Sequence, residues 1–425
     1  MKATIKEVIR NFQNKKIASI VSRKINVPLN SRKVVSLIGT RRAGKTYLLY
    51  QKINELRSAG LDSSKIIFVN FEDERLTFTA KELDLILQSY RELYPEIPLE
   101  ECYFFFDEIQ NVEGWEKFVR RVYDQESKHI FITGSNAKLL STEIATALRG
   151  RTLSYEVYPL SFSEYLEFKG INQDIYLSAN KAKIVSGFHQ FMLTGGFPEL
   201  VGEKDTSTRN KILQEYFNVM IFRDLVERFN VANVQVLKYF IKKILTSVTS
   251  PISVNRIYND LKSSGYSTSK NSLYTFFDQV NDIFLLRMID KFDYSSLKRA
   301  KSDKKAYAID HGFLAALNYQ FSEDKGKVLE NLVALEFFKR QLDITYFKQT
   351  KECDFVVVDR EKTTPLQVAY TIENSGTRKR EVDGLIAACN FLDCRKGYIL
   401  TMEEEEIISH KGFEIEVVPA WKYFL

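Results

Sequence analysis

The sequence predicts an α/β protein of several domains that begins with a parallel sheet flanked by helices. Three observations support this fold class. Short apolar runs, such as residues 33–38 and 103–106, are interleaved with amphipathic helical segments, as in a doubly wound sheet. The 425 residues exceed what one hydrophobic core usually organises. The pattern changes after residue 160, where a helical region is followed by mixed helices and strands.

The composition excludes few function classes, but it indicates in which cellular compartment the protein works. Hydrophobic residues make up 44% and charged residues 27% of the chain, with a net charge of +6, which permits a nucleic-acid partner without requiring one. No apolar run approaches the roughly 20 residues that span a bilayer. The four cysteines form no C-x-x-C pair, so we expect reduced thiols. We therefore expect a cytoplasmic protein without a membrane segment.

The first strand is followed by a segment that predicts a phosphate-binding loop. "GTRRAGKT" satisfies G-x-x-x-x-G-K-[ST] at every fixed position. Two glycines let the backbone N–H groups turn toward phosphates, and a helix begins directly afterwards. A basic surface loop is the alternative, but it does not explain the glycine spacing. The predicted ATP-binding residues are Gly39, Thr40, Arg41, Arg42, Ala43, Gly44, Lys45, Thr46 and Tyr47.

Within this loop the sequence also predicts how a metal would be held. Lys45 can reach the β- and γ-phosphates, and the Thr46 hydroxyl can coordinate Mg²⁺. The strand 103–106 ends in Asp107 and Glu108, and such a strand tip lies beside the phosphate loop in a parallel sheet. Asp107 would hold Mg²⁺ and Glu108 would act as general base toward water. The alternative is that both acids cap the next helix.

Two further segments predict contacts to the γ-phosphate. The strand 129–133 is followed by Gly134, Ser135 and Asn136, and a polar side chain at this tip can position water. The sequence does not separate Ser135 from Asn136. Arg149 and Arg151 flank Gly150; one of them acts on a neighbouring subunit's nucleotide, or both belong to a salt-bridged surface turn. No N-K-x-D string is present to read guanine, which favours ATP over GTP.

These segments carry a resemblance to a known family. "GTRRAGKT", "FFFDEIQNVEGWE", "ITGSNAKLL", "LRGR" and "YPLSFSEYL" resemble the AAA+ ATPases of archaea and bacteria with a C-terminal domain of unknown function 4143. "TGGFPEL" and "FRDLVERF" resemble later blocks of that family. The resemblance implies an AAA+ fold, ATP and Mg²⁺ as cofactors, and a homo-oligomer. Residues 161–229 then suit a small helical lid over the nucleotide.

The next region predicts a winged-helix domain. Helical spacing covers residues 234–250, 253–265 and 267–283, and two extended segments follow at 284–293 and 304–310. The third helix would present Ser267, Thr268, Ser269, Lys270, Asn271 and Tyr274 to a DNA groove. The tip 294–305 contains five basic residues that suit phosphate contacts, namely Lys298, Arg299, Lys301, Lys304 and Lys305. The alternative is a solvated loop on a module that binds a protein partner.

The last region resembles a restriction-endonuclease-like core that lacks one residue. Glu330 on a helix, then Asp354 and Gln367 on strands, follow the order of a metal-dependent nuclease site. The expected lysine after Gln367 is replaced by Ala369 and Tyr370, which supply no positive charge at neutral pH. A basic group could migrate there from elsewhere; the nearest alternatives in the sequence are Lys348, Arg378, Lys379 and Arg380. We expect a degenerate site retained for DNA or protein contact.

The complete prediction is an α/β chain of four parts. A P-loop AAA+ parallel-sheet module (1–160) and a small helical lid (161–229) precede a winged-helix domain (230–318) and an α/β restriction-endonuclease-like domain (319–425). The leading functional hypothesis is an ATPase that drives conformational change in the attached domains on DNA. One alternative is a nucleotide-gated protein-interaction module with slow turnover. The other is an ATP-regulated, metal-dependent DNA nuclease.

Overall fold

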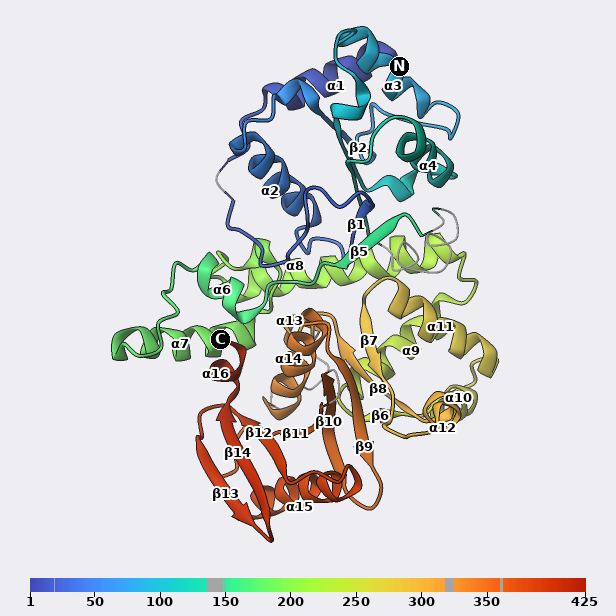
Figure 1. The fold of residues 1–425 in the computed structure, drawn as a ribbon. Coiled ribbons are helices and arrows are strands. Elements are labelled where there is room, and N and C mark those ends of the chain that lie inside the picture. The colour runs from blue at the N-terminus through green and yellow to red at the C-terminus, as the bar shows by residue number, and fades with distance from the viewer. Residues whose placement is uncertain (19, 136–147, 149, 318–324, 360–361) are drawn as a thin grey trace. The chain divides into compact units, whose positions relative to one another are not determined.

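The computed structural model describes the whole chain except residues 19, 136–147, 149, 318–324 and 360–361. Contacts within the chain divide it into two compact units, Met1–Tyr158 and Pro159–Leu425 (Figure 1). Both units mix helices with strands. In the described part of the chain, no helix combines the length and the hydropathy needed to cross a membrane. The cysteines Cys102, Cys353, Cys389 and Cys394 are free thiols.

The first unit is built on a five-stranded parallel sheet with the order β2-β3-β4-β1-β5. This topology confirms the predicted doubly wound sheet. Its strands are β1 (Val34–Ile38), β2 (Ile66–Asn70), β3 (Tyr103–Asp107), β4 (Ile130–Gly134) and β5 (Thr152–Glu156). Its helices are α1 (Lys2–Asn14), α2 (Lys45–Ser58), α3 (Asp84–Leu93) and α4 (Trp115–Gln125).

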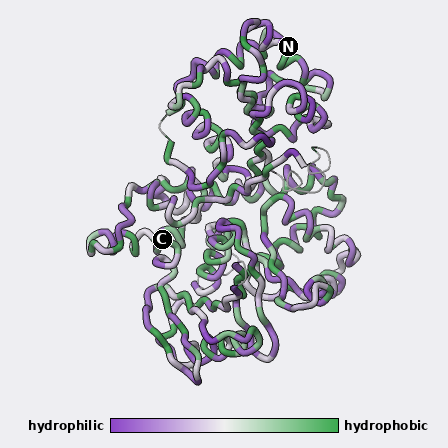
Figure 2. The backbone as a smooth tube through the Cα atoms, viewed as in Figure 1, coloured by the Kyte–Doolittle hydropathy of each residue, from purple (hydrophilic) through white to green (hydrophobic). Residues whose placement is uncertain are grey.

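Helices cover both faces of this sheet, which is why its central strands are apolar throughout. On one face, Leu48 and Ile53 of α2 share a core with Phe105 and Phe131. On the other, Phe118 of α4 packs against Phe106, with ring centroids 5.8 Å apart. Figure 2 shows hydrophobic and hydrophilic residues interleaved along the surrounding helices, as expected for helices with one buried face.

The second unit opens with helices that share a core with its C-terminal part. These are α6 (Phe162–Phe168), α7 (Ser178–Thr194), α8 (Thr206–Val219) and the π-helix Met220–Glu227 that continues α8. Phe162, Phe188 and Phe191 pack in one cluster with Phe337 and Trp421. The helices of residues 161–229 thus belong to the second unit. Their role as a lid over a nucleotide stays a prediction.

The "TGGFPEL" turn has a packing reason for its two glycines. Gly195 has a φ of 79°, and a Cβ there would lie 2.1 Å from the buried carboxylate of Asp310. The Gly196 N–H donates to that carboxylate at 2.7 Å, and the Gly312 N–H donates to it at 2.8 Å. Side chains larger than hydrogen are excluded at Gly195 by both conformation and space. The turn is thus fixed by Asp310 at the end of a distant strand.

The middle of the second unit has the element order predicted for a winged helix. Three longer helices, two short helices and a small sheet of order β6-β8-β7 follow one another along the chain. The elements are α9 (Val234–Thr246), β6 (Pro251–Ile252), α10 (Val254–Ser263), α11 (Lys270–Asp282), β7 (Leu286–Ile289), α12 (Ser296–Lys301), β8 (Lys304–Ala308) and α13 (Gly312–Ala316). The predicted tip between the last two strands contains the short helix α12 rather than a simple hairpin.

The C-terminal part is a six-stranded mixed sheet of order β13-β14-β12-β11-β10-β9. The strands are β9 (Asp343–Lys348), β10 (Glu352–Asp359), β11 (Lys362–Val368), β12 (Lys396–Thr401), β13 (Glu406–His410) and β14 (Phe413–Pro419). The helices are α14 (Lys325–Lys339), α15 (Ser375–Phe391) and α16 (Ala420–Phe424). The pairing of β9 with β10 shifts register between Cys353 and Val356, which places an irregularity at Asp354.

Candidate functional site

The predicted phosphate loop closes tightly between β1 and α2. A Cβ at Gly39 would lie 2.0 Å from the Val157 carbonyl oxygen, so only glycine fits against this backbone. Gly44 is left-handed, with a φ of 94°, and starts α2. The Lys45 ammonium is folded into the loop, where it donates to the Gly39 and Thr40 carbonyls at 3.1 Å each. The loop therefore places a buried cation at a helix N-terminus, an arrangement that attracts anions.

The two side chains predicted to hold Mg²⁺ meet directly. The Thr46 hydroxyl donates to Asp107 Oδ2 at 2.9 Å. Burial raises the pKa of Asp107 to about 6, although hydrogen bonds from Thr133 and Thr46 act to lower it. A hydroxyl and a carboxylate at the end of the phosphate loop are oxygen ligands of the kind that Mg²⁺ prefers. The residues present thus fit a magnesium-bound triphosphate.

The predicted base, Glu108, lies beside the phosphate-loop lysine. Its Oε1 is 3.3 Å from Lys45 Nζ, and Gln110 Nε2 donates to its other oxygen at 2.5 Å. Burial acts to raise the pKa of Glu108, but the charge of Lys45 and the hydrogen bond from Gln110 outweigh burial and lower it. The carboxylate is therefore ionised at neutral pH and able to accept a proton from water. Its backbone is left-handed, with a φ of 52°.

The remaining predicted residues of this site divide into three groups. Ser135 is buried, with its hydroxyl 3.5 Å from Gln110 Nε2. Asn136 and Arg149 lie outside the described residues. Arg151 pairs with Asp124 at 3.0 Å, which is the salt-bridged surface turn that was the alternative for this residue. Action of either arginine on a neighbouring subunit stays a prediction.

In the region predicted to be a winged helix, the structure contradicts one predicted DNA contact. Tyr274 is 54% exposed on α11, and Lys298 and Lys301 are exposed on α12. Lys304 pairs with Asp290 at 2.5 Å. Lys305, however, is fully buried, because its side chain points from β8 into the C-terminal acids instead of toward solvent. It cannot contact a phosphate backbone in this conformation.

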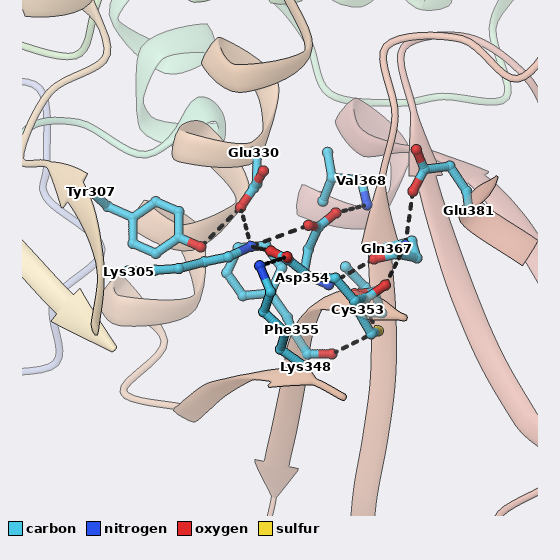
Figure 3. A network of polar contacts seen from close by, with 12 residues as sticks. Lys305, Tyr307, Glu330, Lys348, Cys353, Asp354, Phe355, Gln367, Val368 and Glu381 are labelled. Carbon is cyan, nitrogen blue, oxygen red and sulfur yellow. Dashed lines mark hydrogen bonds and ion pairs between the residues drawn. The ribbon is translucent and has the colours of Figure 1, made fainter. Parts of the chain in front are cut away.

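The predicted nuclease residues converge, and Lys305 lies among them (Figure 3). Lys305 Nζ is 3.3 Å from Glu330, 3.3 Å from Asp354 and 3.0 Å from Glu352. Gln367 accepts from the Asp354 N–H at 2.6 Å. The lysine that contacts Glu330 and Asp354 therefore comes from β8, and not from the alternatives expected from the sequence. Of those, Lys348 pairs with Glu352 at 2.8 Å.

Charges in this cluster are strongly coupled. Burial acts to lower the pKa of Lys305, but Glu330, Asp354 and Glu352 more than offset burial and raise it. Burial and the Asp354 charge raise the pKa of Glu330, although Tyr307 donates to that carboxyl at 3.0 Å. The ammonium thus stays charged among the carboxyl groups. Within the described residues, no group of three or more acidic, histidine or cysteine side chains is arranged to hold a metal ion.

Comparisons with known proteins place the chain in a family. Three family models match it: an AAA domain over residues 31–166, a domain of unknown function (DUF8612) over 185–324, and a domain of unknown function (DUF4143) over 325–423. An uncharacterized protein of Methanocaldococcus jannaschii is 35% identical, and the match covers 98% of this chain and 94% of that relative. The chain belongs to this family of AAA-domain proteins with a C-terminal DUF4143.

Other relatives agree with this assignment at the level of sequence. An uncharacterized protein of Haemophilus influenzae is 31% identical to this family member, over 92% of this chain and 93% of the relative. Among solved structures, the Aeropyrum pernix Orc1 protein in complex with DNA matches 76% of this chain and 92% of its own, at 12% identity and a TM-score of 0.31. A similarity that low carries no argument about function.

Several residues that shape the site of this AAA-domain protein escaped the sequence reasoning. The Thr133 hydroxyl donates to Asp107 Oδ1 at 2.6 Å and accepts from the Glu108 N–H at 2.8 Å. Arg23 donates to the Ala43 carbonyl at 2.6 Å and so braces the phosphate loop. Thr133 was visible as a polar residue at the end of a predicted strand, but its position beside Asp107 depends on the strand order. No local pattern marks Arg23, which reaches the loop only through the fold.

Proposed function

We propose that this protein binds and hydrolyses ATP with Mg²⁺ at the loop Gly39–Thr46. The observation that carries the proposal is the convergence of Lys45, Thr46, Asp107 and Glu108, from two separate elements, at one helix N-terminus. The loop amides and Lys45 bind the phosphates, and Thr46 and Asp107 hold the metal, which neutralises charge on the transferring phosphoryl group. Glu108, ionised and held by Gln110, accepts a proton from the attacking water.

We further propose that the nucleotide cycle drives a conformational change in the second unit, acting on DNA. The support for DNA is the exposed basic residues of α12 and the exposed polar face of α11, which together suit phosphate and groove contacts. The +6 net charge is compatible with this partner. A homo-oligomer, in which an arginine such as Arg149 or Arg151 acts between subunits, belongs to the same proposal.

The experiment is steady-state ATP hydrolysis with and without duplex DNA at two salt concentrations. Turnover should rise with DNA, and the rise should shrink at higher salt because phosphate contacts release counterions. The variant with Lys298→Ala and Lys301→Ala should lose the stimulation while keeping basal turnover. The matched control changes two exposed lysines elsewhere, Lys204→Ala and Lys411→Ala. Basal hydrolysis without any DNA effect would instead favour the nucleotide-gated module that binds a protein partner.

A further inference from the structure

Lys305 is a buried lysine that contacts three carboxyl groups. Its side chain is 1% exposed, and Nζ contacts one oxygen each of Glu330, Glu352 and Asp354 at 3.0–3.3 Å. Lysine is rarely buried unless it is paired. Figure 3 shows the Lys305 ammonium between the carboxyl groups of Glu330 and Asp354.

The surrounding contacts explain why the acids face this point. Asp354 lies in the stretch of β10 where the register shifts, between Cys353 and Val356; its Oδ1 contacts Lys305 at 3.3 Å, and its Oδ2 accepts from the Val368 N–H at 3.0 Å. Gln367, which the sequence analysis placed at a metal-ligand position, makes its hydrogen bonds to other groups. Its oxygen accepts from the Asp354 N–H, and its amide donates to Glu381 at 2.8 Å. The carboxyl oxygens of Glu330, Glu352 and Asp354 are therefore the groups that contact Lys305 Nζ.

We propose that the Lys305 ammonium occupies the cation position of this nuclease-like site. The C-terminal domain then binds no divalent metal there, and the ion pairs of Lys305 hold it to strand β8. The contact distances of 3.0–3.3 Å are those of ammonium–carboxylate pairs, whereas a bound Mg²⁺ needs oxygens that converge to roughly 2.0–2.1 Å from one point. A metal ion cannot enter while the ammonium is present, because the two cations would share the same oxygens and repel each other. The site is then a structural ion cluster.

These ion pairs connect the β6-β8-β7 sheet to the C-terminal sheet. Besides Lys305, β8 carries Tyr307, whose hydroxyl donates to Glu330 at 3.0 Å. The neighbouring backbones also bond directly: the Tyr346 N–H donates to the Asp290 carbonyl at 3.0 Å, and the Phe292 N–H donates to the Tyr346 carbonyl at 2.7 Å. A displacement of β8 would expose the acids, so the two domains move as one body. This inference is independent of ATP hydrolysis and of DNA binding.

The first test is thermal unfolding of the full chain in the presence of EDTA. Lys305→Met should lower the unfolding temperature of the second unit by roughly 6–15 °C, because it leaves carboxylates buried without their cation. Lys304→Met, the adjacent lysine with a partly exposed partner, should change it by less than about 2 °C. A Lys305→Met variant as stable as the wild type would overturn the proposal.

A compensating variant covers the case in which Lys305→Met does not fold. Lys305→Met combined with Glu330→Gln and Asp354→Asn removes the counter-cation together with two of its three carboxylates, and leaves Glu352, which still pairs with Lys348. This triple variant should fold and recover at least half of the lost unfolding temperature. If it remains as unstable as Lys305→Met alone, or fails to fold as well, Lys305 acts through packing and the proposal fails.

The second test asks whether the native site takes a metal. Mn²⁺ binding is measured by electron paramagnetic resonance without nucleotide, on full-length protein carrying Asp107→Asn so that the ATP site does not contribute. The unfolding temperature in EDTA should match that in Mn²⁺, and a further Asp354→Asn change should leave the bound Mn²⁺ unaltered. Mn²⁺ that binds and is then lost on Asp354→Asn would show that a metal, and not Lys305, fills the position.

Discussion

Replacing Thr133 by valine tests how the strand tips hold Asp107 and Glu108, the acids of the proposed ATP site. The Thr133 hydroxyl is fully buried and satisfies two groups at once, Asp107 Oδ1 at 2.6 Å and the Glu108 N–H at 2.8 Å. Valine keeps the shape but leaves both partners without that hydrogen bond. Because each unsatisfied buried group costs about 1–3 kcal/mol, the free energy of unfolding of the first unit should fall by roughly 2–4 kcal/mol.

The same change should slow ATP turnover. The hydrogen bond from Thr133 lowers the pKa of Asp107, against burial, which raises that pKa to about 6. Without this hydroxyl the pKa rises further, so a smaller fraction of Asp107 is ionised to hold Mg²⁺ at neutral pH. Glu108 also loses the contact that fixes its backbone. We expect turnover at fixed Mg²⁺ to drop about tenfold or more, since 1.4 kcal/mol corresponds to a factor of ten.

The assay is urea unfolding followed by tryptophan fluorescence, together with phosphate release. Each unit carries one of the two tryptophans, Trp115 and Trp421, so a Trp421→Phe background isolates the first unit. Thr152→Val is the matched control, because its hydroxyl is also buried in the sheet but has no hydrogen-bond partner among the described residues. The reasoning is refuted if Thr133→Val loses no more stability and no more activity than Thr152→Val.

Three other changes have expected outcomes. Lys45→Ala should abolish ATP binding in calorimetry while far-ultraviolet circular dichroism stays unchanged, because the lost group binds phosphate; normal binding would contradict the loop assignment. Gly39→Ala should weaken ATP affinity more than tenfold, since its Cβ would lie 2.0 Å from the Val157 carbonyl; an unchanged affinity would show that the loop adapts. Lys298→Ala, Arg299→Ala and Lys301→Ala should each lower the slope of log affinity for DNA against log salt by about 1 if they contact phosphate; unaltered slopes would remove α12 from the DNA interface.

The nucleotide site was predictable because its signals are local. The G-x-x-x-x-G-K-[ST] spacing predicts both the loop and the start of the helix. Asp107 and Glu108 follow an apolar strand, and the rule that the ends of parallel strands meet at one edge of the sheet is enough to place them beside the loop. The bonds of Thr133 to both acids were not predictable in the same way. They depend on β3 and β4 being neighbours, and the sequence does not state the strand order.

The C-terminal part was predicted in outline and misread at one residue. The order of helices and strands could be predicted from the sequence, and Glu330, Asp354 and Gln367 do lie close together in the structure. Lys305 was counted with its basic neighbours, because charge runs usually lie on the surface. On strand β8, however, it shares a face with the buried Tyr307, and Ala306 and Ala308 on the other face are buried as well. A lysine in a strand that is buried on both faces implies a buried partner, but the sequence does not show which of Lys304 and Lys305 points inward.

The most direct measurement of the central claim compares phosphate release by Glu108→Gln with that by the wild-type protein, with ATP binding measured on the same samples. Because glutamine keeps the shape but accepts no proton, the variant should bind ATP as tightly as the wild type and release almost no phosphate. Release at the wild-type rate would contradict Glu108 as the base. A wild-type protein that bound no ATP would contradict the nucleotide site as a whole.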